Sequence, residues 1–261
     1  MVSEVSVDAE KQIVQCEQHG EFEQKMTRIM GSVFKTPCPQ CSAEKKAKDE
    51  ERQRDQEKIL AHIRLSQRLG SALIPKRFQG KTFDSYEIRN EKQKKAFDKC
   101  KAYADDFAVN LRAGRSLLLL GKPGTGKTHL AAAIADQILH SSDHQCVYRT
   151  VPSILQHVKS SYDNATNYTE AEVYDSLTQC SLLIIDEIGA TKQTEFELSV
   201  LFTIINGRYE HQLPTIIVSN LMPKELPDAM GERCLDRLRE GGGIALIFDW
   251  ESMRAEIGSD E

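Results

Sequence analysis

GKPGTGKT, at residues 121–128, is the stretch that decides the fold of this 261-residue chain. It fits the pattern G-x-x-x-x-G-K-T, follows the apolar run SLLLL (116–120) and opens the helix-forming run THLAAAIADQIL (128–139). This strand–loop–helix context is that of a phosphate-binding loop, in which glycines let the backbone N–H groups converge on a phosphate at a helix N-terminus. Lys127 supplies positive charge to the phosphates, and the Thr128 hydroxyl binds Mg²⁺. The predicted nucleotide-binding residues are Gly121, Pro123, Gly124, Thr125, Gly126, Lys127 and Thr128.

A matching acidic motif, LLIIDE, occupies residues 182–187. An apolar strand here ends in Asp186, a carboxylate that can hold Mg²⁺, and Glu187 is placed to activate the attacking water as general base. An apolar run that ends in Asp-Glu is common by itself. Together with the phosphate loop it predicts ATP and Mg²⁺ as cofactors, and the glutamate favours hydrolysis over simple binding of the nucleotide.

The chain from residue 116 onward alternates buried-strand runs with amphipathic stretches. The strand runs are SLLLLG, CVYRTV, SLLIIDEI, PTIIVSN and IALIFDW. The stretches near 127–140, 152–178, 194–211 and 223–239 are expected to be helical. Continuous apolar strands separated by helices predict an α/β fold, in which a parallel sheet is flanked by helices on both faces.

Polar residues outside these two motifs are candidates to complete the site. Asn220 ends the strand PTIIVSN, where it can orient the attacking water or contact the γ-phosphate; the alternative is an ordinary turn residue. Arg233 and Arg237 share one face of an expected helix. An arginine there can reach the γ-phosphate of a neighbouring subunit; the alternative is a salt-bridged surface helix. Arg254 is a further candidate phosphate contact within the same chain.

The seven cysteines are distributed unevenly, with three of them in the first 41 residues. Cys16 and His19 form a C-x₂-H pair, and Cys38 and Cys41 form a C-x₂-C pair. Two such pairs predict a closed, four-coordinate structural Zn²⁺ site. Unligated cysteines and a redox-active C-x₂-C are the alternatives, and the lack of a surrounding βαβ pattern disfavours the second. The remaining cysteines, interpreted as core residues, are Cys100, Cys146, Cys180 and Cys234.

Composition excludes several classes of protein. With 40% hydrophobic residues, 28% charged residues and a net charge of −5, the chain is neither disordered nor a polycation that coats nucleic acid. It has no apolar run near the roughly 18 residues of a membrane span, and its first residues lack the pattern of a signal peptide. We therefore expect a cytoplasmic protein with no membrane partner. The expected domains are a zinc-binding module at 1–41, a charged connector helix at 42–70 and a nucleotide-binding domain at 71–261.

These motifs together resemble the DnaC/DnaI-type bacterial helicase loaders, a group of AAA+ ATPases. The similarity covers about residues 70–256 and is carried by GKPGTGKTHLAAAIA, LLIIDEIG, TIIVSN, GERCLDRLREGG, IALIFDW and the lead-in ALIPKRFQGKTFDSY. The resemblance implies an AAA+ P-loop ATPase fold. It also implies that Asp186 and Glu187 are the Walker B pair, Asn220 is sensor 1, Arg237 is the arginine finger and Arg254 is sensor 2.

The resemblance further implies the partners. These are a hexameric replicative helicase, single-stranded DNA and other copies of the chain bound through their ATPase domains. Some DnaI-type loaders carry an N-terminal zinc module that engages the helicase. Residues 1–41 hold six acidic and four basic residues, so a protein is preferred to DNA as the partner of this module. Candidates for DNA contacts, by position alone, are Tyr148, Arg149 and the segment 152–178.

Two other functions are compatible with parts of the pattern. IstB-type transposition ATPases, which act on duplex DNA with a transposase, share much of the ATPase core but usually lack a zinc module. A non-catalytic zinc adaptor would use the nucleotide site only as a structural switch. The Walker B glutamate, Glu187, disfavours the adaptor.

Overall fold

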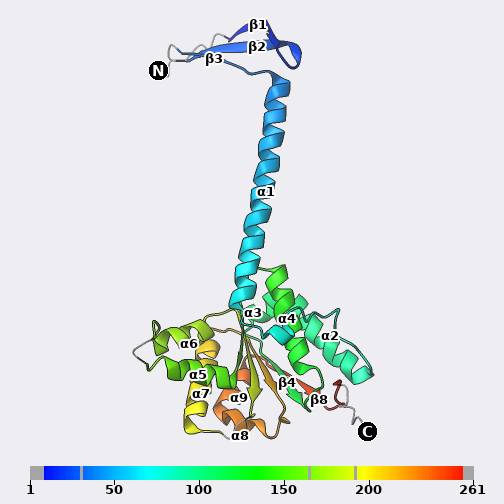
Figure 1. Ribbon diagram of the computed structural model, residues 1–261, viewed down its shortest axis with the longest axis vertical. Helices are drawn as coiled ribbons and strands as arrows, with labels where there is room; N and C mark the ends of the chain where they lie inside the picture. Colours follow the sequence, from blue (N-terminus) through cyan, green and yellow to red (C-terminus); the bar gives the residue numbers. More distant parts are fainter. Residues whose placement is uncertain (1–8, 30–31, 164–165, 191–192, 255–261) are drawn as a thin grey trace, which may run out of the picture. The chain divides into compact units, whose positions relative to one another are not determined.

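The computed structural model describes residues 9–29, 32–163, 166–190 and 193–254. The chain divides into two compact units, Met1–Arg64 and Leu65–Glu261, and helix α1 (Pro39–Ser71) begins in the first unit and ends in the second (Figure 1). The helix expected over 42–70 is therefore present and slightly longer. Within the described ranges, no helix has both the length and the apolar composition needed to cross a membrane.

The first unit contains a small antiparallel sheet in the order β1–β2–β3. Strands β1 (Ala9–Cys16) and β2 (Gly20–Ile29) form a hairpin in which Cys16 lies opposite Gly20, and β3 (Ser32–Lys35) pairs with the second half of β2. Among the described residues of this unit, Cys38 alone is buried. The apolar core here is therefore minimal, as expected for a module that depends on a metal.

The second unit is built on a five-stranded parallel sheet in the order β5–β6–β7–β4–β8. All four neighbouring pairs are parallel, which confirms the predicted α/β class. The phosphate loop follows the fourth strand in this order, and the acidic motif ends the second. The strands are β4 (Leu117–Gly121), β5 (Cys146–Thr150), β6 (Leu182–Ile188), β7 (Thr215–Ser219) and β8 (Ile244–Phe248).

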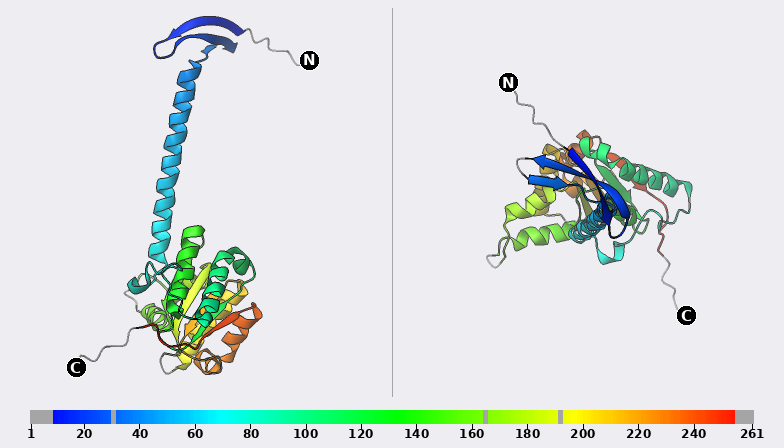
Figure 2. Two further views of the ribbon diagram at one scale, coloured as in Figure 1. Left: turned by 90° about the vertical axis from the view of Figure 1, so that its right-hand side faces the viewer. Right: turned by 90° about the horizontal axis from the view of Figure 1, so that it is seen from above.

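Helices cover both faces of this sheet because alternate side chains of each strand point to opposite sides. Figure 2 shows helices on both sides of the sheet. Leu117 and Leu119 pack in a core with the N-terminal helices and α4, whereas Leu118 and Leu120 pack with the helices α5 to α9. The helices before the acidic motif are η1 (Lys76–Phe78), α2 (Glu91–Asp105), α3 (Phe107–Arg112), α4 (Lys127–Ser141), α5 (Val151–Ser160) and α6 (Glu170–Thr178). Those after it are α7 (Glu195–Glu210), α8 (Leu226–Met230) and α9 (Glu232–Glu240). The four cysteines assigned to the core, Cys100, Cys146, Cys180 and Cys234, are buried.

Two of the expected helical stretches are wrong as single helices. The stretch 152–178 divides into α5 and α6, because the Ser160 hydroxyl bonds back to its own helix and Thr169 begins a new one with a capping box to Glu172. The stretch 223–239 divides into α8 and α9 at Gly231, whose φ of 81° lies in the left-handed region and cannot continue a helix.

Candidate functional site

The phosphate loop connects the end of β4 to the start of α4. At Gly121, φ is 123° and a Cβ would lie 2.4 Å from the carbonyl oxygen of Phe248, so the backbone there admits only glycine. Gly126, with φ at 93°, directly precedes Lys127, the first residue of α4. The predicted residues 121–128 therefore form one continuous loop at a helix N-terminus, which is the geometry for holding phosphate.

Lys127 is folded into this loop. Its Nζ donates to the carbonyl oxygens of Gly121 and Lys122 at 2.7 and 2.6 Å. Burial lowers the pKa of Lys127 to about 8; the Arg254 guanidinium adds to the lowering, and the Asp186 carboxylate opposes it. The loop thus holds a desolvated cation whose charge a bound phosphate would compensate. Arg254 directly follows Met253, whose backbone N–H donates to the carbonyl oxygen of Gly124 in this loop, so the backbone of the expected sensor lies beside it.

Asp186 lies near the end of β6, 7% exposed, with donors on both carboxylate oxygens. The Thr128 hydroxyl donates to Oδ2 at 3.0 Å, and the backbone N–H of Glu187 donates to Oδ1 at 2.6 Å. Tyr148 also donates to Oδ2. A hydroxyl and a carboxylate in contact are the oxygen ligands that Mg²⁺ prefers, so the predicted pair Thr128 and Asp186 fits that ion. Tyr148, which was a candidate DNA contact by position alone, is 3% exposed, and this burial argues against that role.

Glu187 is exposed and has a φ of 65°, in the left-handed region where few non-glycine residues lie. The pairing of β6 with β7 shifts register between Ile185 and Ile188. This irregularity explains how one acid is buried while its neighbour points to solvent. Strain of this kind is concentrated at functional sites. Here the strained residue is the candidate general base, Glu187, which directly follows the candidate metal ligand, Asp186.

The segment after β8 packs directly against the phosphate loop. The Trp250 indole N–H donates to the carbonyl oxygen of Thr125 at 3.0 Å, and the Met253 N–H donates to that of Gly124 at 2.8 Å. An ion pair of 2.7 Å between Lys92 and Asp249 ties the segment to α2. These contacts hold the segment that ends in Arg254 beside the loop. Sequence reasoning did not assign Trp250 a role, although it lies in one of the motifs that carry the family resemblance.

Asn220 follows β7, the strand between β4 and β6, and is exposed. The carboxyl ends of these three parallel strands meet at one edge of the sheet, so the structure brings Asn220, Asp186 and the phosphate loop to that same edge. This is the placement expected for a residue that contacts the attacking water or the γ-phosphate.

Arg237 lies elsewhere. Its guanidinium stacks 4.4 Å from the centroid of the Tyr209 ring, and its Nε donates to Asn206 Oδ1 at 3.2 Å. It lines a pocket with Ser116 and Thr215, which stand at the amino ends of strands, opposite the phosphate loop. It therefore does not belong to the nucleotide site of its own chain. Arg233, four residues earlier on α9, is exposed and has no hydrogen bond or ion pair with any described residue.

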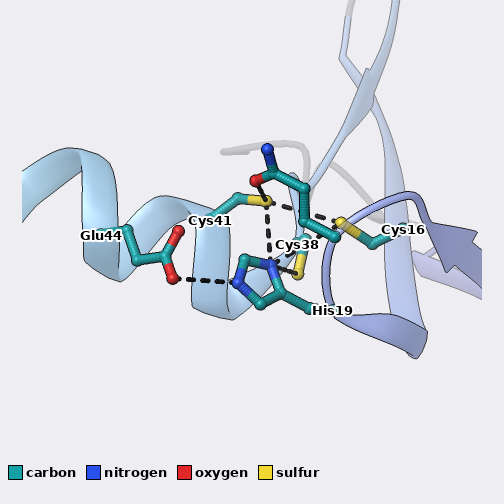
Figure 3. Close-up of polar contacts among 6 residues, drawn as sticks. Cys16, His19, Cys38, Cys41 and Glu44 are labelled. Carbon is teal, nitrogen blue, oxygen red and sulfur yellow. Dashed lines mark hydrogen bonds and ion pairs between the residues drawn. The ribbon is translucent and has the colours of Figure 1, made fainter.

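The four predicted zinc ligands lie together in the first unit (Figure 3). One ligand atom from each of them lies within 4.8 Å of all the others. Cys16 Sγ is 3.5 Å from Cys41 Sγ, and His19 Nδ1 is 3.2 Å from Cys41 Sγ and 3.8 Å from Cys38 Sγ. A tetrahedral Zn²⁺ with ordinary bond lengths sets such edges at about 3.6–3.8 Å, so these residues fit a zinc ion.

Glu44, on the first turns of α1, supports this cluster and was not found from sequence. His19 Nε2 is 3.0 Å from Glu44 Oε1, which leaves Nδ1 facing the sulfurs. A carboxylate behind a histidine ligand fixes the tautomer and the ring orientation in metal sites. The Gln18 backbone N–H, assisted by Cys41 and His19, lowers the pKa of the Cys16 thiol to about 6. Cys16 thus favours the thiolate form that binds metal. The hydrogen bond to Cys16, with burial, raises the pKa of the Cys41 thiol to about 11, so the second thiolate forms only when a cation compensates the charge.

Comparison with known proteins extends these observations. The model of the family described as IstB-like ATP binding protein matches residues 44–254, which begin after the four candidate zinc ligands. The replicative helicase loader DnaC of Buchnera aphidicola subsp. Schizaphis graminum is 31% identical over 248 residues, covering 93% of this chain and 98% of the relative. A crystal structure of the DnaC helicase loader has a TM-score of 0.60 at 22% identity, covering 67% of this chain and 99% of that one. The replication initiator DnaA bound to AMPPCP and single-stranded DNA has a TM-score of 0.57 at 20% identity, over 69% and 52% of the two chains.

Proposed function

The chain belongs to the family of IstB-like ATP-binding proteins, as a relative of the replicative helicase loader DnaC, and we propose that it is an ATP-dependent loader of a hexameric replicative helicase. It is an ATPase with the AAA+ fold. One observation carries the loader proposal: the similarity to a named loader extends over 93% of this chain, so it includes more than the ATPase core that many AAA+ proteins share.

In the proposed hydrolysis, the backbone of residues 121–128 and the Lys127 ammonium bind the phosphates. Thr128 and Asp186 would hold Mg²⁺, which when bound neutralises charge on the phosphate oxygens. Glu187, exposed at the edge of the sheet, accepts a proton from the attacking water, and Asn220 orients that water. Arg254 is held beside the loop by the segment after β8, and in this proposal it contacts the phosphates of the nucleotide bound to the same chain.

The proposal includes self-association, because the nucleotide site of one chain lacks an arginine from α9. Arg237 lies at the edge of the sheet opposite its own phosphate loop, so it can contribute only to the site of a neighbouring copy. Arg233 is the second candidate, since its guanidinium is exposed and makes no polar contact within the described residues. An arginine supplied by a neighbour stabilises charge in the transition state and makes hydrolysis depend on assembly.

The partners in the proposal are the helicase and single-stranded DNA. The zinc module and α1 are assigned to the helicase, because residues 1–41 have no excess of basic residues and the sheet exposes Ile13 and Phe34 at 72% and 58%. Single-stranded DNA is assigned to the ATPase unit. The support for this assignment is the likeness of its fold to a structure of the replication initiator DnaA bound to single-stranded DNA.

A transposition helper that acts with a transposase on duplex DNA is the second candidate. The description of the matching family favours it. Against it stand the extent of the similarity to DnaC loaders and a Cys₃His cluster that lies outside the residues matched by the family model.

Affinity capture with the tagged full-length protein separates the two candidates. We expect the hexameric replicative helicase of the same organism to be retained, and to be transferred to single-stranded DNA when ATP is present. Cys38→Ser should lose the helicase. Lys127→Ala should retain the helicase and fail to transfer it. Retention of a transposase and duplex DNA, with no binding of purified helicase, would reject the loader in favour of the transposition helper.

A further inference from the structure

We propose that Tyr148 is a positioning residue of the ATPase site, whose buried phenol fixes the Asp186 carboxylate in the orientation needed to hold Mg²⁺ with the nucleotide. This inference rests on the proposed nucleotide and Mg²⁺ site, and it adds to that site a residue which none of the motifs contains.

The sheet itself brings Tyr148 to Asp186. Strand β5 is the edge strand next to β6, and Tyr148 pairs with Ile184, two residues before the carboxylate. Its side chain points to the face covered by α4 and belongs to the apolar cluster on that side. The ring therefore packs in the core between the sheet and α4, and its hydroxyl reaches the carboxyl end of β6.

The hydroxyl has a specific partner. It donates to Asp186 Oδ2, which also accepts the Thr128 hydroxyl at 3.0 Å. Among the described residues, no other acceptor contacts the Tyr148 hydroxyl. Because the other oxygen, Oδ1, accepts the Glu187 N–H, the carboxylate is held at both ends and cannot rotate without losing buried hydrogen bonds.

The direction of these hydrogen bonds matters for the metal. A phenol keeps its proton at neutral pH and a carboxylate can only accept, so in this contact the Tyr148 hydroxyl is the donor. The Thr128 hydroxyl has one proton and two lone pairs, and its proton is already committed to Asp186. Its lone pairs therefore remain free for a cation. Tyr148 and Thr128 together arrange two oxygen ligands before any ion binds.

A merely structural role for the hydroxyl is the competing explanation, and Tyr103 provides the matched control. It is also 3% exposed and lies in the same apolar cluster. Its hydroxyl donates at 2.8 Å to the backbone carbonyl of Arg115, which is not part of the nucleotide site. Phenylalanine at either position removes one buried hydroxyl and keeps the ring that fills the core.

The experiment measures binding of a fluorescent ADP analogue by anisotropy, first in EDTA and then during titration with Mg²⁺. In Tyr148→Phe we expect the affinity for the analogue in EDTA to be unchanged. The Mg²⁺ concentration that gives half of the Mg²⁺-dependent change in analogue binding should be about tenfold higher, because removing a residue that orients a metal ligand weakens metal binding by about that factor in other sites. Tyr103→Phe should match the wild type in both. A Mg²⁺ midpoint of Tyr148→Phe within twofold of the wild type, or an equal rise in Tyr103→Phe, would overturn the inference. If the wild type itself bound no analogue, the proposed nucleotide site would fail, so the two failures are distinguishable.

Discussion

Removal of zinc is expected to unfold the three-stranded sheet of the first unit and leave the ATPase unit folded. The perturbation is Cys38→Ser, or treatment of the wild type with a strong chelator. Cys38 is the one buried residue among those described in the first unit, and its sulfur lies 3.8 Å from His19 Nδ1. The substitution replaces one sulfur atom by oxygen. It therefore removes a metal ligand and also changes the centre of a very small core.

The magnitude follows from what else holds the strands. Val14, Phe22 and Met26 are the apolar side chains on the better-covered face, and each is only partly buried. Partial burial of three such side chains contributes about 2–4 kcal/mol, and an isolated hairpin in water is marginal at best. A structural Zn²⁺ site contributes about 10–16 kcal/mol of apparent binding free energy. The free energy contributed by the metal is several times larger than that contributed by burial of the apolar side chains. Without the metal, the strands should therefore be unfolded.

The assay combines metal content, limited proteolysis and nucleotide binding on the same preparations. We expect about one zinc per chain in the wild type. After chelation, or in Cys38→Ser, we expect rapid cleavage within residues 9–35 while binding of a fluorescent nucleotide is retained. Cys234→Ser, which alters a buried cysteine outside the cluster, is the control for a cysteine substitution and should keep its zinc. If the chelated protein resisted cleavage within residues 9–35, or if the pure protein held well under one zinc, the reasoning would be refuted.

Two further predictions concern the ATPase unit. Because Glu187 has a φ of 65° and the left-handed conformation costs a non-glycine residue roughly 1–2 kcal/mol, Glu187→Gly should be about 1 kcal/mol more stable to urea than Glu187→Ala. Both variants should bind ATP and lose hydrolysis; equal or greater stability of the alanine variant would argue against strain at this position. Arg237→Ala should lower hydrolysis on the order of 1,000-fold at unchanged nucleotide affinity, if it acts on the neighbour's nucleotide. Arg233→Ala is the comparison, and a loss confined to that variant would move the role to Arg233.

The features that were predictable from the sequence are those encoded by short, contiguous spacing. The phosphate loop, the end of β6 and the two ligand pairs each lie within a few residues, so their local geometry follows from the order of residue types. The contact of Tyr148 with Asp186 was not predictable, because it depends on which strand becomes the neighbour of β6. The order of parallel strands is set by long connections that a single strand does not encode. Glu44 was missed because its partner His19 is 25 residues away, between β1 and β2, and no local spacing relates the two residues. The end of the helix near residue 160 could have been predicted, because Thr169 and Glu172 form a capping box that begins a new helix. The helical spacing of apolar residues over 152–178 led instead to the prediction of one helical stretch.

Strand β8 connects the two parts of the site that the sequence treats separately. It pairs with β4, which ends in the phosphate loop, and it is followed by the segment whose Trp250 and Met253 contact that loop. It is preceded by α9 through three glycines, and at Gly243 a Cβ would lie 2.3 Å from the carbonyl oxygen of Leu238. Close packing of this kind leaves little freedom for relative movement. Strand β8 and the three glycines therefore link the phosphate loop to the helix that carries Arg233 and Arg237 over a few residues of chain. If either arginine contacts a neighbouring copy, as proposed, this short link predicts that the contact depends on the nucleotide state.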